Sequence, residues 1–380
     1  MDFVVISTAD WDHPLWTNKQ HVASTLASMG HRVLYIESLG LRKPMLTRSD
    51  RLRIKKRFKR IFEGLRLVQD NIWVMSPFSI PGLNNSALRF INEKLLIKMI
   101  KISITKLGFS NIVLWTYNPT VSYLIKNLPY WKSVYHCVDD ISEQPKMNKR
   151  WLQDEEKKLL NSVDMVFTTS LTLQKEKSQI NKKCYYYPNV ADYEHFHRAC
   201  VESFNRPADL PPVGKPILGF IGAISKYKQD FQLLLFLAQQ CHDCNIVLIG
   251  SGDEDLSKIF GSYNNIYLLG MKPYGDLPQY LSFFDVALLP CCINAYTDHM
   301  FPMKFFEYLA AGKPVVSTDL KTLQDFSSYC YLAHQYSDFV NAIRIALQAS
   351  EKKKMGCELA AQYTYRSRME WMLELLMKSK

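Results

Sequence analysis

Several features that would classify this chain of 380 residues at once are missing from its sequence. No apolar run reaches the roughly 18 residues that a membrane-spanning helix needs. Asp2 and Asp10 flank the only apolar segment near the N-terminus, which argues against a secretory signal peptide. The nine cysteines are odd in number and scattered through apolar segments, which does not indicate a disulfide framework. We therefore expect a cytoplasmic chain in a reducing compartment.

Patterns for metal or nucleic acid are also missing or weak. Cys241-His-Asp-Cys244 is a single C-x-x-C pair without a second half at zinc spacing, and it more simply ends a helix and begins a strand. Asp253-Glu-Asp255 resembles a helix start more than a metal site. No helix-turn-helix, zinc-finger or RNA-recognition pattern occurs, so we expect no nucleic-acid partner.

Positive charge is concentrated in one segment of a chain whose net charge is +11. Residues Arg42 to Arg60 contain ten Lys or Arg and a single acid, Asp50, with apolar side chains in between. A basic amphipathic segment of this kind is typical of proteins that lie on anionic membranes. A solvated loop and surface helix explain it equally well, and nucleic acid is a third possibility.

Short apolar runs alternate with segments of helical spacing along the chain, which predicts an α/β fold of parallel, doubly wound sheets. The alternation stops between Asp192 and Pro216, where four prolines stand close together, and then restarts. We therefore predict two Rossmann-like halves, each without the G-x-G-x-x-G fingerprint. The predicted domains are residues 1–195, a linker at 196–215, residues 216–362, and a C-terminal helix at 363–380 that crosses back to the first domain.

One stretch, from Asn294 to Thr318, has well-marked boundaries. A polar loop precedes a predicted helix that Pro302 opens and that Gly312 and Pro314 close before the next strand. Lys304 and Glu307 are three residues apart and share one face of the first two turns, where backbone amides and the helix dipole favour an anion. This pattern predicts a site for phosphate and sugar.

This stretch, with the two halves and the proline-rich linker, resembles the GT-B glycosyltransferases. The helix follows the form Pro-x-Lys-x-x-Glu-Tyr-Leu-Ala-Ala-Gly-Lys-Pro-Val-Val. Further matching pieces occur in the expected order: Pro188-Asn-Val-Ala-Asp192, Phe220-Ile-Gly222, Leu248-Ile-Gly-Ser-Gly252, Leu269-Gly270, Tyr274-Gly-Asp-Leu-Pro-Gln-Tyr280 and Phe284-Asp-Val-Ala-Leu-Leu-Pro290. The resemblance is to the retaining, group 1 or family 4 branch that builds bacterial surface polysaccharides such as O-antigen or capsule.

The resemblance implies two Rossmann-like domains that face a cleft, and a donor site in the second half. Lys304 would supply a cation to the departing diphosphate, and Glu307 would accept hydrogen bonds from the ribose. A solvated carboxylate paired with Lys304 is the alternative for Glu307. The remaining implied donor-site residues are Gly222, Gly250, Lys226 and Lys228, the two lysines being placed near the phosphates. The family generally needs no metal, so we expect no essential metal and no other cofactor.

One position departs from the family's pattern. Retaining members often carry Glu-x7-Glu, but eight residues before Glu307 this chain has His299. Asn294 and Thr297, with loop amides up to Phe301, are therefore expected to contact the donor sugar or phosphate. Without the carboxylate, a retaining reaction would run on one face of the sugar, with the leaving phosphate helping to deprotonate the acceptor hydroxyl.

Acceptor-side residues are expected in the first half. His136 and Asp139 follow a strand and are predicted to lie at its carboxyl end, where either could orient and deprotonate a hydroxyl. A buried, hydrogen-bonded histidine is an equally good interpretation of His136. Trp11, Asp12 and His13 are weaker candidates in another loop, since a tryptophan there is more often a packing residue.

The sequence thus predicts a glycosyltransferase that moves a sugar from a nucleotide diphosphate donor, UDP rather than GDP, to a lipid-linked or polysaccharide acceptor. Retention of the anomeric configuration and peripheral attachment to the inner face of the cell membrane through Arg42–Arg60 are also expected. Two alternatives stay open: a nucleotide-sugar epimerase or hydrolase on the same fold, and a non-catalytic basic scaffold protein.

Overall fold

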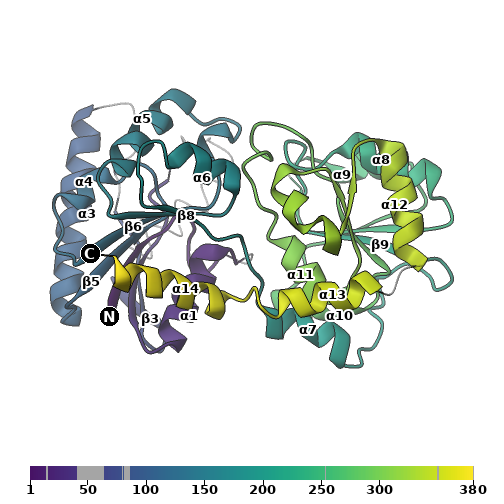
Figure 1. Cartoon of the computed structure of the whole chain (residues 1–380), viewed down its shortest axis with the longest axis horizontal. Coiled ribbons are helices and arrows are strands. Elements are labelled where there is room, and N and C mark those ends of the chain that lie inside the picture. Colours follow the sequence, from purple (N-terminus) through teal and green to yellow (C-terminus); the bar gives the residue numbers. More distant parts are fainter. Residues whose placement is uncertain are drawn as a thin grey trace. The chain divides into compact units, whose positions relative to one another are not determined.

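The computed structural model describes residues 1–13, 16–40, 64–78, 80, 86–252, 254–348 and 351–379. The basic segment Arg42–Arg60 lies outside the described residues. Contacts divide the chain into two compact units, shown in Figure 1. Unit 1 comprises Met1–Tyr187 and Met369–Lys380, and unit 2 comprises Pro188–Arg368.

Unit 1 is built on an eight-stranded sheet with the order β3-β4-β2-β1-β5-β6-β7-β8. Its strands are β1 (Asp2–Ile6), β2 (Arg32–Ile36), β3 (Leu65–Gln69), β4 (Ile72–Met75), β5 (Ile112–Thr116), β6 (Lys132–Cys137), β7 (Met165–Thr168) and β8 (Cys184–Tyr186). All neighbours are parallel except β3 and β4. The predicted parallel sheet is confirmed except at this edge, where β3 and β4 are antiparallel. Only Asp70 and Asn71 separate the two strands, a connection far too short for a parallel crossover.

Helices cover both faces of this sheet (Figure 1). They are α1 (Asn18–Ser28), α3 (Ser86–Leu107), α4 (Ser122–Ile125), α5 (Lys149–Leu160), α6 (Leu171–Lys177) and the end of α14 (Tyr365–Lys378), with a 3-10 turn at Ile141–Glu143. One face packs its strand residues against α3, α4, α5 and α6 in a single apolar core. On the other side lie α1 and α14 (Figure 1).

Unit 2 is built on a six-stranded sheet with the order β11-β10-β9-β12-β13-β14, and every neighbouring pair is parallel. Its strands are β9 (Ile217–Ile221), β10 (Asn245–Ile249), β11 (Ile266–Gly270), β12 (Val286–Leu289), β13 (Val315–Thr318) and β14 (Tyr331–Ala333). Alternate residues along β9, β10 and β12 point into two separate apolar cores, one on each face. Unit 2 is therefore doubly wound, as the sequence predicts.

One core packs against α8 (Phe231–Gln240), α9 (Leu256–Phe260) and α12 (Tyr336–Gln348). The other packs against α7 (Tyr193–Val201), α10 (Leu277–Ser282), α11 (Lys304–Ala310) and α13 (Glu351–Ala360), as Figure 1 also shows. Short 3-10 helices lie at Tyr274–Asp276 and Lys321–Tyr329. Helix α7 occupies the stretch in which the sequence predicts the start of an irregular linker. Among the described residues, no helix combines the length and apolar character required to cross a membrane.

At the centre of the unit 2 sheet, close packing leaves room for glycine but not for a larger residue. Gly219 lies in the middle of β9, and a Cβ atom added there would stand 1.9 Å from the ring of Phe284. Phe284 is itself buried in the core, so its ring has little room to move away.

We predict that Gly219→Ala lowers the free energy of unfolding by about 1–3 kcal/mol, the usual cost of overpacking a core. Urea unfolding of the purified variant measures this. Gly275→Ala is the matched control, because a Cβ there meets open space, and it should change stability by less than about 0.5 kcal/mol. Equal stability of the two variants would contradict the packing argument.

Candidate functional site

The two central strands of unit 2 mark the position where ligands usually bind in an open parallel sheet. After β9 the chain continues to β10 and β11 on one side, and after β12 it continues to β13 and β14 on the other. Ligands bind outside the carboxyl ends of the strands at such a switch point. The loops that leave it are residues 222–230 after β9 and 290–303 after β12.

These two loops are hydrogen-bonded to each other. The backbone N–H of Cys292 donates to the carbonyl of Lys228 at 2.7 Å, and the N–H of Asp230 donates to the carbonyl of Pro290 at 2.8 Å. The ammonium group of Lys228 lies 5.1 Å from the ring centroid of Tyr296, a cation–π contact that adds to the pairing. Of the two predicted phosphate-site lysines, Lys228 is therefore held against the second loop, whereas Lys226 is exposed.

Asn294 and Thr297 shape the second loop from within. The Asn294 amide donates to the carbonyl of Tyr227 at 2.8 Å, while its side-chain oxygen accepts from the N–H groups of Tyr296 and Thr297, both at 3.0 Å. The Thr297 side chain is fully buried and donates to the carbonyl of Cys292 at 2.6 Å. These bonds commit much of the hydrogen-bonding capacity of both side chains to the loop, so the two residues fix the shape of the loop.

Gly222 and Gly250 stand at the ends of β9 and β10, where two backbones approach each other closely. A Cβ atom at Gly250 would lie 1.8 Å from the carbonyl oxygen of Gly222, and Gly250 has a φ of +147°. Glycine is needed at position 250 because both the space and the backbone conformation exclude a side chain. The predicted donor-site glycines therefore keep the strand ends free of side chains.

Helix α11 presents Lys304 and Glu307 as a close ion pair. The ammonium Nζ and the carboxylate Oε2 are 2.5 Å apart, and the Glu307 side chain is only 7% exposed against 26% for Lys304. The solvated surface pair considered as an alternative does not fit this burial. The helix begins at Lys304 rather than at Pro302, so the predicted start was two residues too early; Pro302 and Met303 form the turn that leads into it.

Two sets of contacts fix α11 relative to the switch point. The Tyr308 hydroxyl accepts a hydrogen bond of 2.8 Å from the N–H of Ile221, the residue before Gly222. Phe305 and Phe306 lie in a buried aromatic cluster, in which Phe306 stacks on Tyr363 at 4.7 Å between ring centroids. Lys304 and Glu307 are thereby held on a rigid helix beside the end of β9.

Helix α7 adds residues that the sequence alone did not indicate. The His195 ring stacks on Tyr274 at 4.1 Å, and its Nε2 lies 3.0 Å from the Tyr274 carbonyl. Burial lowers the pKa of His195, so the imidazole is neutral near pH 7. Burial, reinforced by the charges of Glu307 and Asp192, raises the pKa of the Tyr274 hydroxyl. The neutral aromatic side chains of His195 and Tyr274 are therefore close enough to Glu307 for its charge to act on both.

Two motif residues have structural roles that their sequence positions could not reveal. The Asn189 amide donates to the carbonyl of Phe301 at 2.6 Å, which ties the Pro188–Asp192 motif to the turn before α11. The imidazole of His299, which replaces the expected glutamate, lies with Nδ1 at 2.6 Å from the carbonyl of Ala295. Both contacts help to fix the course of the loop that leads to Lys304.

In unit 1 the predicted acceptor residues differ in how accessible they are. His136 is fully buried on β6 among aromatic rings, with Trp115 at 5.6 Å and Tyr117 at 4.9 Å between ring centroids. Tyr135 and Cys137, its neighbours on β6, face the core formed with α3 to α6, so the His136 ring lies on the opposite face of the sheet, where it has no exposed surface. Asp139 is half-buried, two residues beyond the end of β6.

The loop after β1 lies at the corresponding switch point of unit 1, between β1 and β5. Trp11 is buried and packs edge-on against Tyr35 at 5.1 Å between ring centroids, so it is a packing residue. Its backbone N–H donates to the Glu37 carboxylate at 2.9 Å. Asp12 and His13 are exposed in the same loop, and the Asp12 carboxylate lies 3.5 Å from the guanidinium of Arg66.

Comparison with known proteins agrees with this geometry. Residues 215–349, which contain the paired loops and α11, match the family model described as "Glycosyl transferases group 1". This part of the chain is a group 1 glycosyltransferase domain. A curated relative named "Putative teichuronic acid biosynthesis glycosyltransferase TuaH", from Bacillus subtilis (strain 168), is 28% identical over 218 residues, 52% of this chain and 53% of that protein. The chain therefore spans about half the length of that relative.

Solved structures share the whole fold. Sucrose-phosphate synthase from Thermosynechococcus elongatus has a TM-score of 0.73 at 17% identity, over 99% of this chain and 98% of that one. HepE of Anabaena in complex with UDP has a TM-score of 0.66 at 13% identity, over 99% and 100% of the two chains. WaaG, a glycosyltransferase involved in lipopolysaccharide biosynthesis, has a TM-score of 0.60 at 11% identity, over 97% and 98%. The glycosyltransferase domain thus belongs to a chain with the GT-B fold.

At the opposite end of α11, burial lowers the pKa of Lys313 to about 8 from an ordinary value of 10.5. The charged form is therefore disfavoured in the folded state. The loss of folding stability that this causes is fully present below pH 8. It becomes smaller as the pH rises from about 8 to about 10.5, because the folded state then loses a proton that the unfolded chain retains.

We predict that Lys313→Met stabilises the protein at pH 7 by up to about 3 kcal/mol and that this gain shrinks by pH 10. Urea unfolding of both proteins at the two pH values measures it. Lys313→Met also removes a hydrogen bond of 2.9 Å from Lys313 to the Ser282 carbonyl. Lys215→Met is the control for this lost hydrogen bond, because it removes a similar but exposed bond from the Lys215 Nζ to the His242 carbonyl. A difference between Lys313→Met and wild type that is the same at pH 7 and pH 10 would contradict the prediction.

Proposed function

We propose that this glycosyltransferase transfers a sugar from a UDP-sugar to a hydroxyl of a lipid-linked or polysaccharide acceptor. The observation that carries the proposal is the Lys304–Glu307 pair, held by α11 at the switch point of unit 2. Among structures with the same fold, HepE of Anabaena has been solved with UDP-glucose, and the trehalose-6-phosphate enzyme of Escherichia coli with UDP-2-fluoro glucose. The names of the Bacillus relative and of WaaG support a cell-surface polymer as acceptor.

In this proposal Lys304 and Glu307 act on different parts of the donor. Departure of the UDP leaves negative charge on the diphosphate, and the partly buried ammonium group of Lys304 stabilises it. The Glu307 carboxylate has two oxygens, so it can accept hydrogen bonds from ribose hydroxyls while it remains paired with Lys304. Because both groups are already fixed on one helix, little side-chain ordering is required on binding.

We propose further that the reaction retains the anomeric configuration and uses no metal ion at the diphosphate. The position of the family's first glutamate is held by His299, which excludes a carboxylate nucleophile there. The acceptor hydroxyl then attacks on the face from which the UDP departs: its oxygen bonds to the anomeric carbon, the bond from that carbon to the phosphate oxygen breaks, and the leaving diphosphate takes the proton. Nuclear magnetic resonance of the product determines the configuration at the new linkage.

On the acceptor side the proposal relies on the accessible polar residues of unit 1. Asp139, Asp12 and His13 are the residues that we propose for orienting the hydroxyl, and Asp139 is the strongest candidate because it follows a central strand. His136 is proposed to act only indirectly, by packing beneath the loop that carries Asp139.

We predict that Lys304→Met and Glu307→Gln each reduce kcat/KM with a UDP-sugar by at least about tenfold, because each removes a charged contact worth about 1.5–3 kcal/mol. A panel of UDP- and GDP-sugars, tested with and without acceptor, identifies the donor by turnover. Lys258→Met is the matched control, since Lys258 forms a pair of the same spacing with Asp255 on α9 but is 84% exposed. The control should retain full turnover.

The same assay separates the alternatives. Consumption of the UDP-sugar at the same rate without acceptor would assign a hydrolase or epimerase. Unchanged turnover in both variants, with the wild-type melting temperature, would show that Lys304 and Glu307 are not part of the donor site. Absence of UDP binding by calorimetry would favour a scaffold protein.

We also propose that the enzyme associates peripherally with the inner face of the cell membrane through Arg42–Arg60. We predict that the full-length protein sediments with anionic liposomes at low ionic strength and is released as salt is raised, because the attraction is screened. Neutral liposomes are the control. Equal binding to both kinds of liposome, or none to either at low salt, would contradict the proposal.

A further inference from the structure

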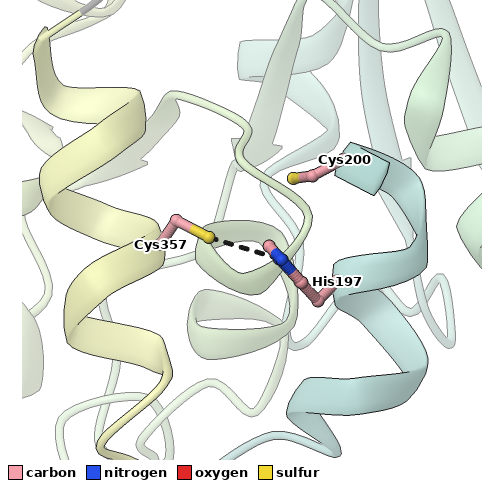
Figure 2. Close-up of side chains that lie close together, drawn as sticks. All are labelled: His197, Cys200 and Cys357. Atoms are coloured by element: carbon pink, nitrogen blue, oxygen red, sulfur yellow. Dashed lines mark hydrogen bonds between the residues drawn. The ribbon is translucent and has the colours of Figure 1, made fainter. Parts of the chain in front are cut away.

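Three side chains with metal-binding atoms meet on the side of unit 2 that carries α7, α11 and α13. His197 and Cys200 come from α7 and Cys357 comes from α13, as Figure 2 shows. Their ligand atoms, one imidazole nitrogen and two sulfurs, all lie within 4.8 Å of one another. None of the three contributes to the donor site proposed above.

We propose that His197, Cys200 and Cys357 bind a zinc ion, or another divalent ion that prefers nitrogen and sulfur ligands. One imidazole and two thiolates are a ligand set typical of zinc, and a water or a backbone carbonyl can take the fourth position. The set does not follow a sequence motif, because Cys200 and Cys357 are 157 positions apart in the sequence (357 minus 200). The inference therefore rests on the fold alone.

The distance between the ligand atoms of His197 and Cys357 is close to that of a bound site. With Zn–S bonds of about 2.3 Å and Zn–N bonds of about 2.0–2.1 Å, a tetrahedral ion holds its sulfur and nitrogen ligands about 3.6 Å apart. The Cys357 sulfur and the His197 Nδ1 are 3.4 Å apart, joined by the hydrogen bond drawn in Figure 2. Rotation of the exposed Cys200 side chain is then the main adjustment required.

The backbone around the cluster also favours a cation. His197 Nδ1 lies 3.3 Å from the carbonyl oxygen of Ala310, and the sulfurs of Cys200 and Cys357 lie 3.6 and 3.8 Å from the same oxygen. Ala310 is the last residue of α11, where the carbonyl groups at the end of a helix carry partial negative charge. The Ala310 carbonyl is therefore placed either to ligate the ion directly or to stabilise its charge.

Neighbouring residues hold the proposed ligands in place. The Tyr193 ring stacks on the His197 ring at 4.8 Å with an interplanar angle of 14°. The Tyr193 hydroxyl lies 3.7 Å from the Cys357 sulfur, and it would donate to that sulfur once the thiol is ionised. Gly312, with a φ of +63°, allows the chain to pass close to Cys200, since a Cβ there would stand 2.7 Å from its sulfur. Such outer contacts orient the ligands of metal sites.

The charge balance is also suitable. Two thiolates would neutralise the charge of a divalent ion. Binding therefore displaces thiol protons.

The test is titration of the full-length, reduced and chelator-treated protein with Co²⁺ and Zn²⁺. Co²⁺ should bind with one-to-one stoichiometry and give a thiolate-to-cobalt charge-transfer band, and Zn²⁺ should displace it and raise the melting temperature. Loss of an outer contact alone costs about 10–100-fold in metal affinity, so Cys200→Ser, Cys357→Ser and His197→Gln should each lose at least about 100-fold. Cys292→Ser, which changes a partly exposed cysteine elsewhere in unit 2, should bind as the wild type does.

Wild-type affinity in the Cys200→Ser and Cys357→Ser variants would overturn the proposal, as would equal loss in Cys292→Ser. Absence of metal binding by the reduced protein, with formation of a Cys200–Cys357 disulfide on mild oxidation, would also overturn it and assign the pair to redox chemistry. Circular dichroism of each variant verifies that it is folded. Since the readout is metal binding, the result is independent of donor chemistry and of the proposed function.

Discussion

The hydrogen bond between the Tyr308 hydroxyl and the N–H of Ile221 is the contact on which the candidate site depends. It joins the helix that carries Lys304 and Glu307 to the last residue of β9, at the switch point of the unit 2 sheet. Both partners are buried, so water does not compete for the bond, and its loss would leave a buried N–H without its partner at considerable cost. The pairing of residues 222–230 with 290–303 then follows from the strand order, because β9 and β12 are neighbours.

Helix α11 has only seven residues, and each of its ends has a different chemical environment. Lys304 and Glu307 form an ion pair in its first half, while the carbonyl of Ala310 at its end lies close to His197, Cys200 and Cys357. The aromatic cluster around Phe305 and Phe306 anchors the middle. A short helix held in this way moves as one body, so the donor chemistry at its start and the metal chemistry proposed at its end share one rigid support.

Much of the fold could be predicted from the sequence because its strands are buried on both faces and form short apolar runs, such as β9 and β10. The Lys304–Glu307 pair could be predicted because Gly312 and Pro314 mark the end of its helix. Helix α7 could not be predicted, since only Phe196 and Ala199 of its nine residues are buried. His195, His197 and Cys200, which lie on this helix, were consequently not predicted as site residues. The burial of His136 could not be predicted either. A fully buried strand end has the same sequence pattern as a strand followed by a functional loop, and only the aromatic residues around His136 in the structure distinguish the two.

Lys304 and Glu307 are proposed together to bind the nucleotide diphosphate part of the donor. Calorimetry with UDP on the wild type, Lys304→Met, Glu307→Gln and the double variant tests it most directly, since the cycle isolates the coupling between the two side chains. We expect each single variant to lose at least about tenfold in UDP affinity. The double variant should lose less than the product of the two single losses, because the side chains are in contact. Equal UDP affinity in all four proteins would contradict it.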